Sequence, residues 1–203
     1  MDISPYDEFA VENALQHKDS SGGTVTAITL GGPGADKVLK GVKALGVDNI
    51  VRLDYDGFMD SNGLQSVLAN EISSGGYDVV YCGKSAADSG AGSTGPGIAE
   101  RLGWCSVSNI IDIKFENGLI VTSPAEGGNA IISVTLPAVV SCDKGATKVR
   151  KSNVKGIMMA KKAQVEVKSV SPPDASITIV SHVMPKAKPA GKKFEGVASA
   201  ETV

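Results

Sequence analysis

The sequence predicts an α/β fold with a doubly wound, mostly parallel sheet, an added β-hairpin and an extended C-terminal arm. Three observations support this prediction. Helical segments alternate with short apolar runs in the first half of the chain, glycine-rich turns follow these runs, and prolines interrupt the last part. Alternating helices and strands favour a parallel sheet covered on both faces. We therefore expect an α/β domain over residues 1–165 and the arm over residues 166–203.

Local signals define the elements of the α/β domain. Ser4 is expected to cap a first helix, because Pro5 and the acidic residues after it are typical of a helix start. Further helices are expected at 35–45, at 62–72 and from Pro96 onwards, where apolar residues recur at helical spacing. The predicted strands are the short apolar or β-branched runs 24–30, 48–53, 79–82, 108–115, 119–123, 130–136 and 137–142. The turn Asn117-Gly118 favours a hairpin.

The composition excludes several classes of protein. With 203 residues, of which 42% are hydrophobic, the chain suits one globular domain with a sizeable core. A net charge of −2 gives no sign of a nucleic-acid-binding surface. No apolar run approaches the roughly 18–20 residues that span a bilayer, and no signal peptide precedes Pro5. We therefore expect no membrane span and a cytoplasmic location.

Cysteines and histidines do not form a pattern typical of a metal or catalytic site. Cys82, Cys105 and Cys142 contain no CxxC pair and lie in apolar surroundings, as core thiols in a reducing compartment do. His17 and His182 are the only histidines, so a zinc site or a histidine-based triad is not expected. No paired catalytic carboxylates or activated nucleophile can be identified, and we predict neither catalytic nor metal-binding residues.

Two glycine-rich loops are expected at the carboxyl ends of parallel strands, where ligands of such sheets bind. One is Gly31–Gly34, and the other runs from Lys84 to Thr94 and opens a helix. A helix start preceded by hydroxyl side chains offers N–H and O–H groups to a phosphate. The glycines match neither GxGxxG nor GxxxxGK[ST], so a flexible connection explains the second loop equally well. Asp88 either holds a ribose hydroxyl or caps a local turn.

Five stretches of the chain carry a family resemblance: SPYDEFAVENAL (4–15), TLGGPGADKVLKGVKALGVD (29–48), VVYCGKSAADSGAGSTGPGIAERLGW (79–104), VTSPAEGGNAIISVTLPAVVSC (121–142) and SNVKGIMMAKKAQVEV (152–167). Together they resemble the β-subunit family of electron transfer flavoproteins. The resemblance covers residues 3–167 and is weaker beyond them. It implies an adenine nucleotide alpha hydrolase-like fold for the nucleotide-binding domain.

The resemblance also implies a function. Members pair with an α subunit that holds most of the redox-active FAD, and they carry electrons from a flavin dehydrogenase to a downstream acceptor without acid–base catalysis of their own. The β subunit binds AMP in the ordinary type and a second FAD in the electron-bifurcating type. The residues expected to contact this nucleotide are Ser4, Leu30, Gly31, Asp88, Gly90, Ala91, Gly92, Ser93 and Thr94.

The chain departs from the family pattern at several positions. Gly92-Ser93-Thr94 replaces Asn-Gln-Thr in the nucleotide loop, Ser4 stands where the family has Asn, and Ser123 and Ala130 stand where it has Lys and Gln. The family also places a strand before the helix that begins after Ser4. We expect such a strand to lie centrally in the sheet. Either the protein starts further upstream, which is the interpretation we favour, or another segment fills the gap.

Two alternatives to the AMP-binding subunit remain open from the sequence. In one, this subunit holds FAD in an electron-bifurcating complex, and in the other the chain is a nucleotide-binding α/β domain without a redox role. The arm carries apolar residues such as Ile177 and Val183 between prolines, which indicates docking on the α subunit. The alternative for the arm is a disordered tail.

Overall fold

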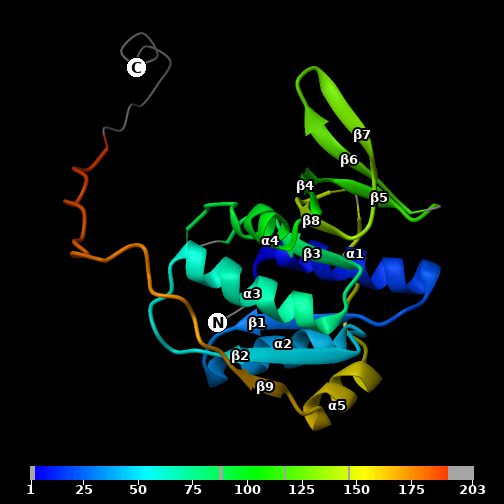
Figure 1. The fold of residues 1–203 in the computed structure, drawn as a ribbon, viewed down its shortest axis with the longest axis horizontal. Helices are drawn as coiled ribbons and strands as arrows, with labels where there is room; N and C mark the ends of the chain where they lie inside the picture. Colours follow the sequence, from blue (N-terminus) through cyan, green and yellow to red (C-terminus); the bar gives the residue numbers. More distant parts are fainter. Residues whose placement is uncertain (1–2, 87–88, 117, 146, 192–203) are drawn as a thin grey trace, which may run out of the picture.

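The computed structural model describes residues 3–86, 89–116, 118–145 and 147–191 of the chain. They form three small sheets and the helices that cover them (Figure 1). The helices are α1 (Pro5–Ser21), η1 (Pro33–Ala35), α2 (Asp36–Ala44), α3 (Ser61–Gly75), α4 (Thr94–Leu102) and α5 (Val154–Lys162). The strands are β1 (Thr26–Leu30), β2 (Asn49–Asp54), β3 (Val79–Gly83), β4 (Cys105–Ile110), β5 (Asp112–Lys114), β6 (Leu119–Ala125), β7 (Gly128–Val134), β8 (Ala138–Cys142) and β9 (Glu166–Ser169).

Two of the sheets are parallel and the third is antiparallel. The first parallel sheet has the order β1-β2-β9, the second has the order β3-β8-β4, and the antiparallel sheet has the order β5-β6-β7. The prediction of an α/β fold with mostly parallel strands is therefore confirmed. The parallel strands do not, however, form the single continuous sheet that was expected.

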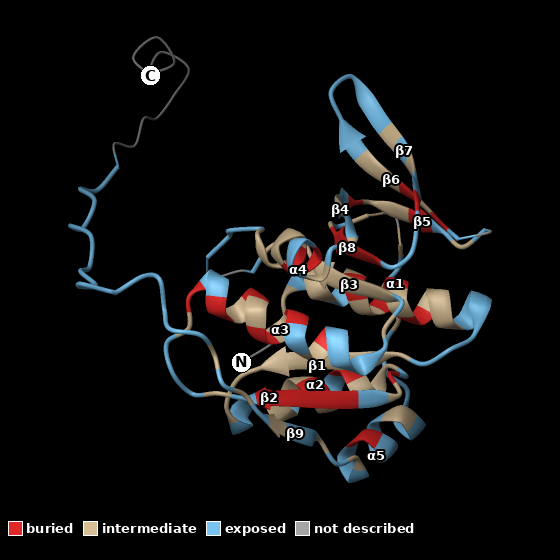
Figure 2. Ribbon diagram, viewed as in Figure 1, coloured by how far each residue is buried: buried red, intermediate tan, exposed pale blue. Residues whose placement is uncertain are grey.

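The break in the parallel sheet lies between β1 and β3. Each of these strands pairs on one side only, β1 with β2 and β3 with β8. Both are half-buried along their whole length, whereas every residue of β8 is buried (Figure 2). The apolar run 79–82 was predicted to be a buried strand, and an unpaired edge explains why it is only half-buried.

Two helices connect the parallel sheets across this break. On α1, Ala10 joins the apolar cluster of Val140, and Leu15 joins the cluster of Ile50. On α3, Ala69 lies in the cluster of Val139, while another residue of the helix packs on β2. Since Val139 and Val140 are consecutive in a strand, they point to opposite faces. The two helices therefore cover opposite faces of the second sheet.

Helix ends follow the expected capping chemistry. The Ser4 hydroxyl accepts a hydrogen bond from the Tyr6 N–H at 3.3 Å, as predicted for the cap of α1. Asp60 caps α3 by accepting from the Gly63 N–H at 2.8 Å, so this helix starts slightly earlier than the sequence indicated. The C-terminal cap of α2 is Leu45.

The chain beyond β9 leaves the sheets as an extended segment (Figure 1, orange to red). One contact near its beginning is a hydrogen bond from the Ser176 N–H to Asp60 Oδ2 at 2.6 Å. The large apolar side chains after it are exposed: Ile177, Ile179, Val180, Val183 and Met184. These side chains are therefore available to another surface.

Three further observations bear on the expectations from composition. All three cysteines are free, and Cys142 is buried as predicted, but Cys105 is exposed because it begins β4 at the edge of its sheet. Within the described ranges, no helix is long and apolar enough to cross a membrane. In the same part of the chain, no three His, Cys, Asp or Glu residues gather as a metal site would require.

Candidate functional site

The carboxyl end of β3 is the centre of the candidate site. Its last residue, Gly83, donates its N–H to Asp7 Oδ1 at 2.7 Å, which ties the strand to the first turn of α1. A Cβ on Gly83 would lie 2.9 Å from the Tyr6 Cβ, so only glycine allows this approach. Burial raises the pKa of Asp7, and the hydrogen bond from Gly83 partly offsets that effect.

The loop after β3 depends on its glycines. Gly90 and Gly92 both have a φ of 62°, a left-handed conformation that glycine adopts without strain. A Cβ on Gly92 would also lie only 3.2 Å from the Lys84 carbonyl oxygen. Gly90 donates its N–H to the Ala86 carbonyl at 3.0 Å and closes a turn. These contacts fold the loop back toward β3.

The loop ends in α4, whose first turn rests on β3. A Cβ on Gly95 would lie 2.7 Å from Cys82 Sγ, so the helix meets the strand at a position that only glycine fits. Ser93 and Thr94 are half-buried at this helix start, and the Ser93 hydroxyl makes no capping bond to the helix. Backbone N–H groups of a helix start carry a partial positive charge and suit a phosphate.

Two side chains that the sequence did not single out hold this helix start in place. Gln65 on α3 donates to the Ser93 carbonyl at 3.0 Å, and Arg101 on α4 donates to Gln65 Oε1 at 2.8 Å. Gln65 is buried although it is polar. A polar residue within the apolar face of a predicted helix was the signal that could have identified it.

A cluster of charges lies beside Tyr6 at the same end of the strands. Lys84 Nζ is 2.8 Å from Asp143 Oδ2 and 5.0 Å from the centre of the Tyr6 ring, and Lys144 Nζ is 5.6 Å from that centre. The hydrogen bond that Lys84 donates to the Asp143 carboxylate raises the pKa of Lys84. Burial opposes ionisation of Asp143, but the Lys84 ammonium outweighs it and the pKa of the carboxyl falls. The ion pair of Lys84 and Asp143 therefore remains charged at neutral pH.

The turn after β1 is ordered by a buried arginine. Arg52 is 6% exposed, donates to the Gly31 carbonyl at 3.1 Å and pairs with Asp36 at 2.7 Å. A second carboxylate, Asp54, also contacts its guanidinium. Arg52 was not identified from the sequence, because an arginine within a strand gives no local sign of its partners.

The structure therefore brings together part of the predicted site. Gly90, Ala91, Gly92, Ser93 and Thr94 lie on one loop beside β3, and Ser4 caps the helix that contacts the end of this strand. Leu30 and Gly31 end β1 on the other side of the break, and no described hydrogen bond joins them to the loop. Asp88 lies outside the described residues.

A second exposed surface lies at the amino end of the parallel strands, on α5. Four large apolar side chains of this helix are exposed, and we call them the α5 patch: Val154 (75%), Ile157 (42%), Met158 (59%) and Met159 (60%). Lys161 and Lys162 follow them on the same helix. A cleft of about 540 Å³ between α5 and the start of β2 places the patch at this end. Exposed apolar side chains beside lysines are typical of a protein-binding surface.

Comparison with known proteins identifies the family. Residues 1–173 match the model of the electron transfer flavoprotein domain. The chain is 31% identical to the electron transfer flavoprotein subunit beta of Bacillus subtilis over 96% of its length and 80% of that relative. It is 33% identical to the subunit of the same name from Syntrophomonas wolfei, over 95% of the chain and 77% of the relative.

A differently named relative gives a similar match. Protein FixA of Azotobacter vinelandii is 31% identical over 81% of the chain and 62% of that protein. The domain match and these similarities extend over both parallel sheets and the loop that opens α4. The chain therefore belongs to the electron transfer flavoprotein β-subunit family.

Proposed function

We propose that the chain is the β subunit of a heterodimeric electron transfer flavoprotein and binds AMP at the carboxyl end of β3. The observation that carries this proposal is the start of α4, which Gly95 and the Gln65–Ser93 contact hold against the strand. Its N–H groups and hydroxyls form a fixed donor set for one phosphate. An adenine nucleotide alpha hydrolase-like fold is part of this proposal.

The remaining predicted residues surround the rest of the nucleotide. Gly90–Thr94 approach the phosphate, and Ser4, Leu30 and Gly31 lie toward the adenine. Asp88, which lies outside the described residues, is assigned to the ribose from its place in the sequence. FAD binds mainly in the α subunit, and this chain supports it without contributing an acid or a base. We place the complex in the cytoplasm, where it passes electrons from a dehydrogenase to an acceptor.

Two surfaces serve the protein partners. The apolar side chains of the arm dock on the α subunit, since they are exposed and lie far from the sheets (Figure 2). The α5 patch docks on the flavin dehydrogenase that supplies electrons. It is separate from the arm, and its exposed apolar side chains and two lysines suit a partner surface that has an apolar groove with an acidic rim.

The proposal is tested by purifying the chain together with its α subunit and measuring nucleotide content. We expect one AMP and one FAD per heterodimer. Two flavins per heterodimer and no AMP would support the electron-bifurcating alternative. A chain that binds nucleotide as a stable monomer and forms no complex with the α subunit would support the domain without a redox role.

Deleting residues from Ser171 onward tests the role of the arm. We expect the shortened chain to retain its α/β domain and lose co-purification with the α subunit, because the exposed apolar side chains of the arm are removed. Circular dichroism and the melting temperature of the isolated chain report the folded state. Normal co-purification of the shortened chain would contradict the docking role.

A further inference from the structure

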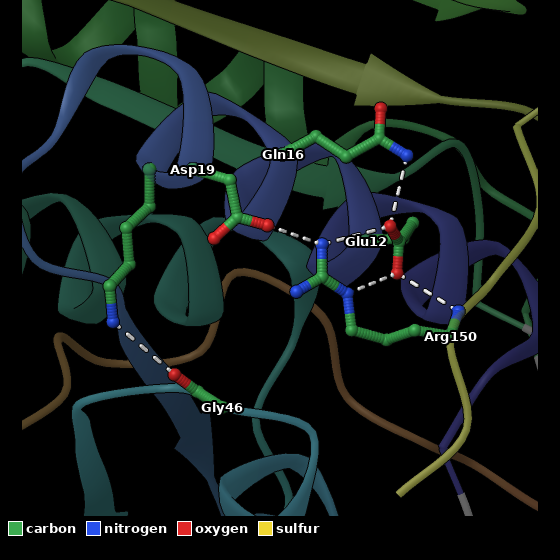
Figure 3. Close-up of polar contacts among 6 residues, drawn as sticks. Glu12, Gln16, Asp19, Gly46 and Arg150 are labelled. Atoms are coloured by element: carbon green, nitrogen blue, oxygen red, sulfur yellow. Dashed lines mark hydrogen bonds and ion pairs between the residues drawn. The ribbon is translucent and has the colours of Figure 1, made fainter.

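We propose that Glu12 and Arg150 are positioning residues that hold the α5 patch in the orientation required for docking on the electron-donating dehydrogenase. This inference rests on the proposed function. It concerns a contact that lies between α1 and the segment leading into α5 (Figure 3).

Glu12 is a buried carboxylate that accepts most of its hydrogen bonds from Arg150. It is 4% exposed, and it accepts hydrogen bonds from the Arg150 N–H at 3.0 Å, from Nε at 2.9 Å and from Nη2 at 3.1 Å. Gln16 donates to the same carboxylate at 2.9 Å. The contact therefore fixes both the side chain and the backbone of Arg150.

Neighbouring charges favour this ion pair. Arg150 also pairs with Asp19 at 2.9 Å, and Asp19 lies about two helical turns after Glu12 on α1 (Figure 3). Burial opposes ionisation of Glu12, but the hydrogen bonds from Arg150 lower the pKa of the carboxyl. A planar guanidinium bound at several points restricts orientation more than a single ammonium contact does.

Arg150 lies close to the start of α5 along the chain. Residues 143–153 connect β8 to α5 and contain no helix or strand among those described. Asn153, three residues after Arg150, caps α5 by accepting from the Gly156 N–H at 2.7 Å. A Cβ on Gly156 would lie 2.3 Å from the Ala44 carbonyl oxygen, so the first turn of α5 also rests on the end of α2. The start of α5 is thus held from α1 and from α2.

The α5 patch begins directly after these contacts. Val154 is the first residue of α5, and the other three side chains follow within its next turns. Without the Arg150 contact, residues 143–153 are no longer held against α1, so the α5 patch samples more orientations. Docking then loses more conformational entropy, which weakens binding of the partner. The nucleotide loop lies at the opposite end of the strands and makes no described contact with Arg150.

The test uses the complete heterodimer with its dehydrogenase. Arg150→Ala is expected to raise the KM for the dehydrogenase about tenfold while kcat at saturation changes less than about twofold. Arg150→Lys should recover part of the KM, because it restores the charge without the multiple contacts. Lys148→Ala is the matched control, since Lys148 is an exposed cation of the same connection and has no ion pair among the described residues.

Two additional measurements separate positioning from general stability. Hydrogen exchange of residues 153–162 should accelerate in Arg150→Ala, while exchange in residues 90–97 and the AMP content stay unchanged. The double variant Glu12→Gln with Arg150→Met removes both charges and avoids leaving a buried carboxylate unpaired, so it provides the test if Arg150→Ala does not fold. In the double variant we expect the same increase in KM.

The outcomes distinguish this inference from the proposed function. An unchanged KM and unchanged exchange in residues 153–162 would overturn the positioning role. A parallel loss of AMP, kcat and melting temperature would also overturn it, because the pair would then be merely structural. A wild-type heterodimer that accepts electrons from no flavin dehydrogenase would instead overturn the proposed function, and exchange in α5 would still report on positioning.

Discussion

The two ends of the parallel strands are built from different chemistry. At the carboxyl end of β3, the surface consists of glycines, backbone groups and the hydroxyls of Ser93 and Thr94. At the amino end, α5 presents four large apolar side chains and two lysines. Backbone donors fixed by tight packing suit a small anion, whereas exposed apolar side chains suit a protein surface. Under the proposed function, nucleotide binds at the carboxyl end of β3 in one parallel sheet, and a partner docks at the amino end of β2 in the other.

The largest expected effect is the loss of AMP affinity caused by Gly92→Val, at the carboxyl end of β3. The new side chain would occupy a left-handed conformation and crowd the Lys84 carbonyl, so we expect AMP binding to weaken by about 3 kcal/mol. Isothermal titration of the heterodimer after removal of AMP measures this loss. Gly34→Ala is the control, because its Cβ meets no atom within 4 Å and its φ is not positive. An equal effect of both changes would contradict the account.

Thr94→Val tests whether a side-chain hydroxyl at the start of α4 contributes to AMP binding. It keeps the shape of the side chain and removes a hydroxyl at the helix start, so AMP affinity should fall by about 1–3 kcal/mol. Thr94→Ser retains the hydroxyl and should bind within about threefold of the wild type, a difference below 1 kcal/mol. The same titration measures both variants. Unchanged affinity in Thr94→Val would show that the hydroxyl does not contact the phosphate.

At the amino end, Met158→Glu should affect only docking. A negative charge within an exposed apolar patch next to lysines opposes the acidic rim expected on the partner, and we expect a loss of about 1–2 kcal/mol. The KM for the dehydrogenase measures it, and AMP content provides the reference. Met158→Leu keeps the apolar area and should behave as the wild type. A loss of AMP in Met158→Glu would contradict the claim that the α5 patch and the nucleotide site are independent.

The smallest expected effect concerns the charges beside Tyr6. The pKa of Asp143 is lower in the folded chain, so the stabilisation from its ion pair with Lys84 is present above the ordinary pKa of 3.8 and is lost as the pH falls below it. Because the pair is partly exposed, we expect at most about 1 kcal/mol. Urea unfolding of the wild type and Asp143→Asn should differ at pH 6 and converge under acid. A constant difference at both pH values would exclude this pair as the cause.

Local patterns predicted much of the fold. Ser4 caps α1, the run 137–142 contains the buried strand β8, and the loop 84–94 opens a helix, because each depends on neighbouring residues. The break between β1 and β3 was not predicted, because strand pairing joins residues that are distant in sequence. The pairing of β9 with β2 was missed for the same reason.

The contacts of the candidate site show the same limit. Helical periodicity placed Gln65 on α3 but gave no indication that its amide holds Ser93, 28 positions later. Arg150 was part of a basic stretch in the sequence, and its buried partner Glu12 lies 138 positions earlier. Glycine positions predicted that the loop would turn, whereas the atoms that it approaches depend on the packed structure.

Hydrogen exchange of the heterodimer tests the separation of the two ends most directly. Adding AMP to the nucleotide-free complex should protect residues 90–97 and leave residues 153–162 unchanged. Adding the dehydrogenase should protect residues 153–162 and leave residues 90–97 unchanged. Protection of residues 90–97 by the dehydrogenase, or of residues 153–162 by AMP, would contradict the assignment of nucleotide and partner to opposite ends of the parallel strands.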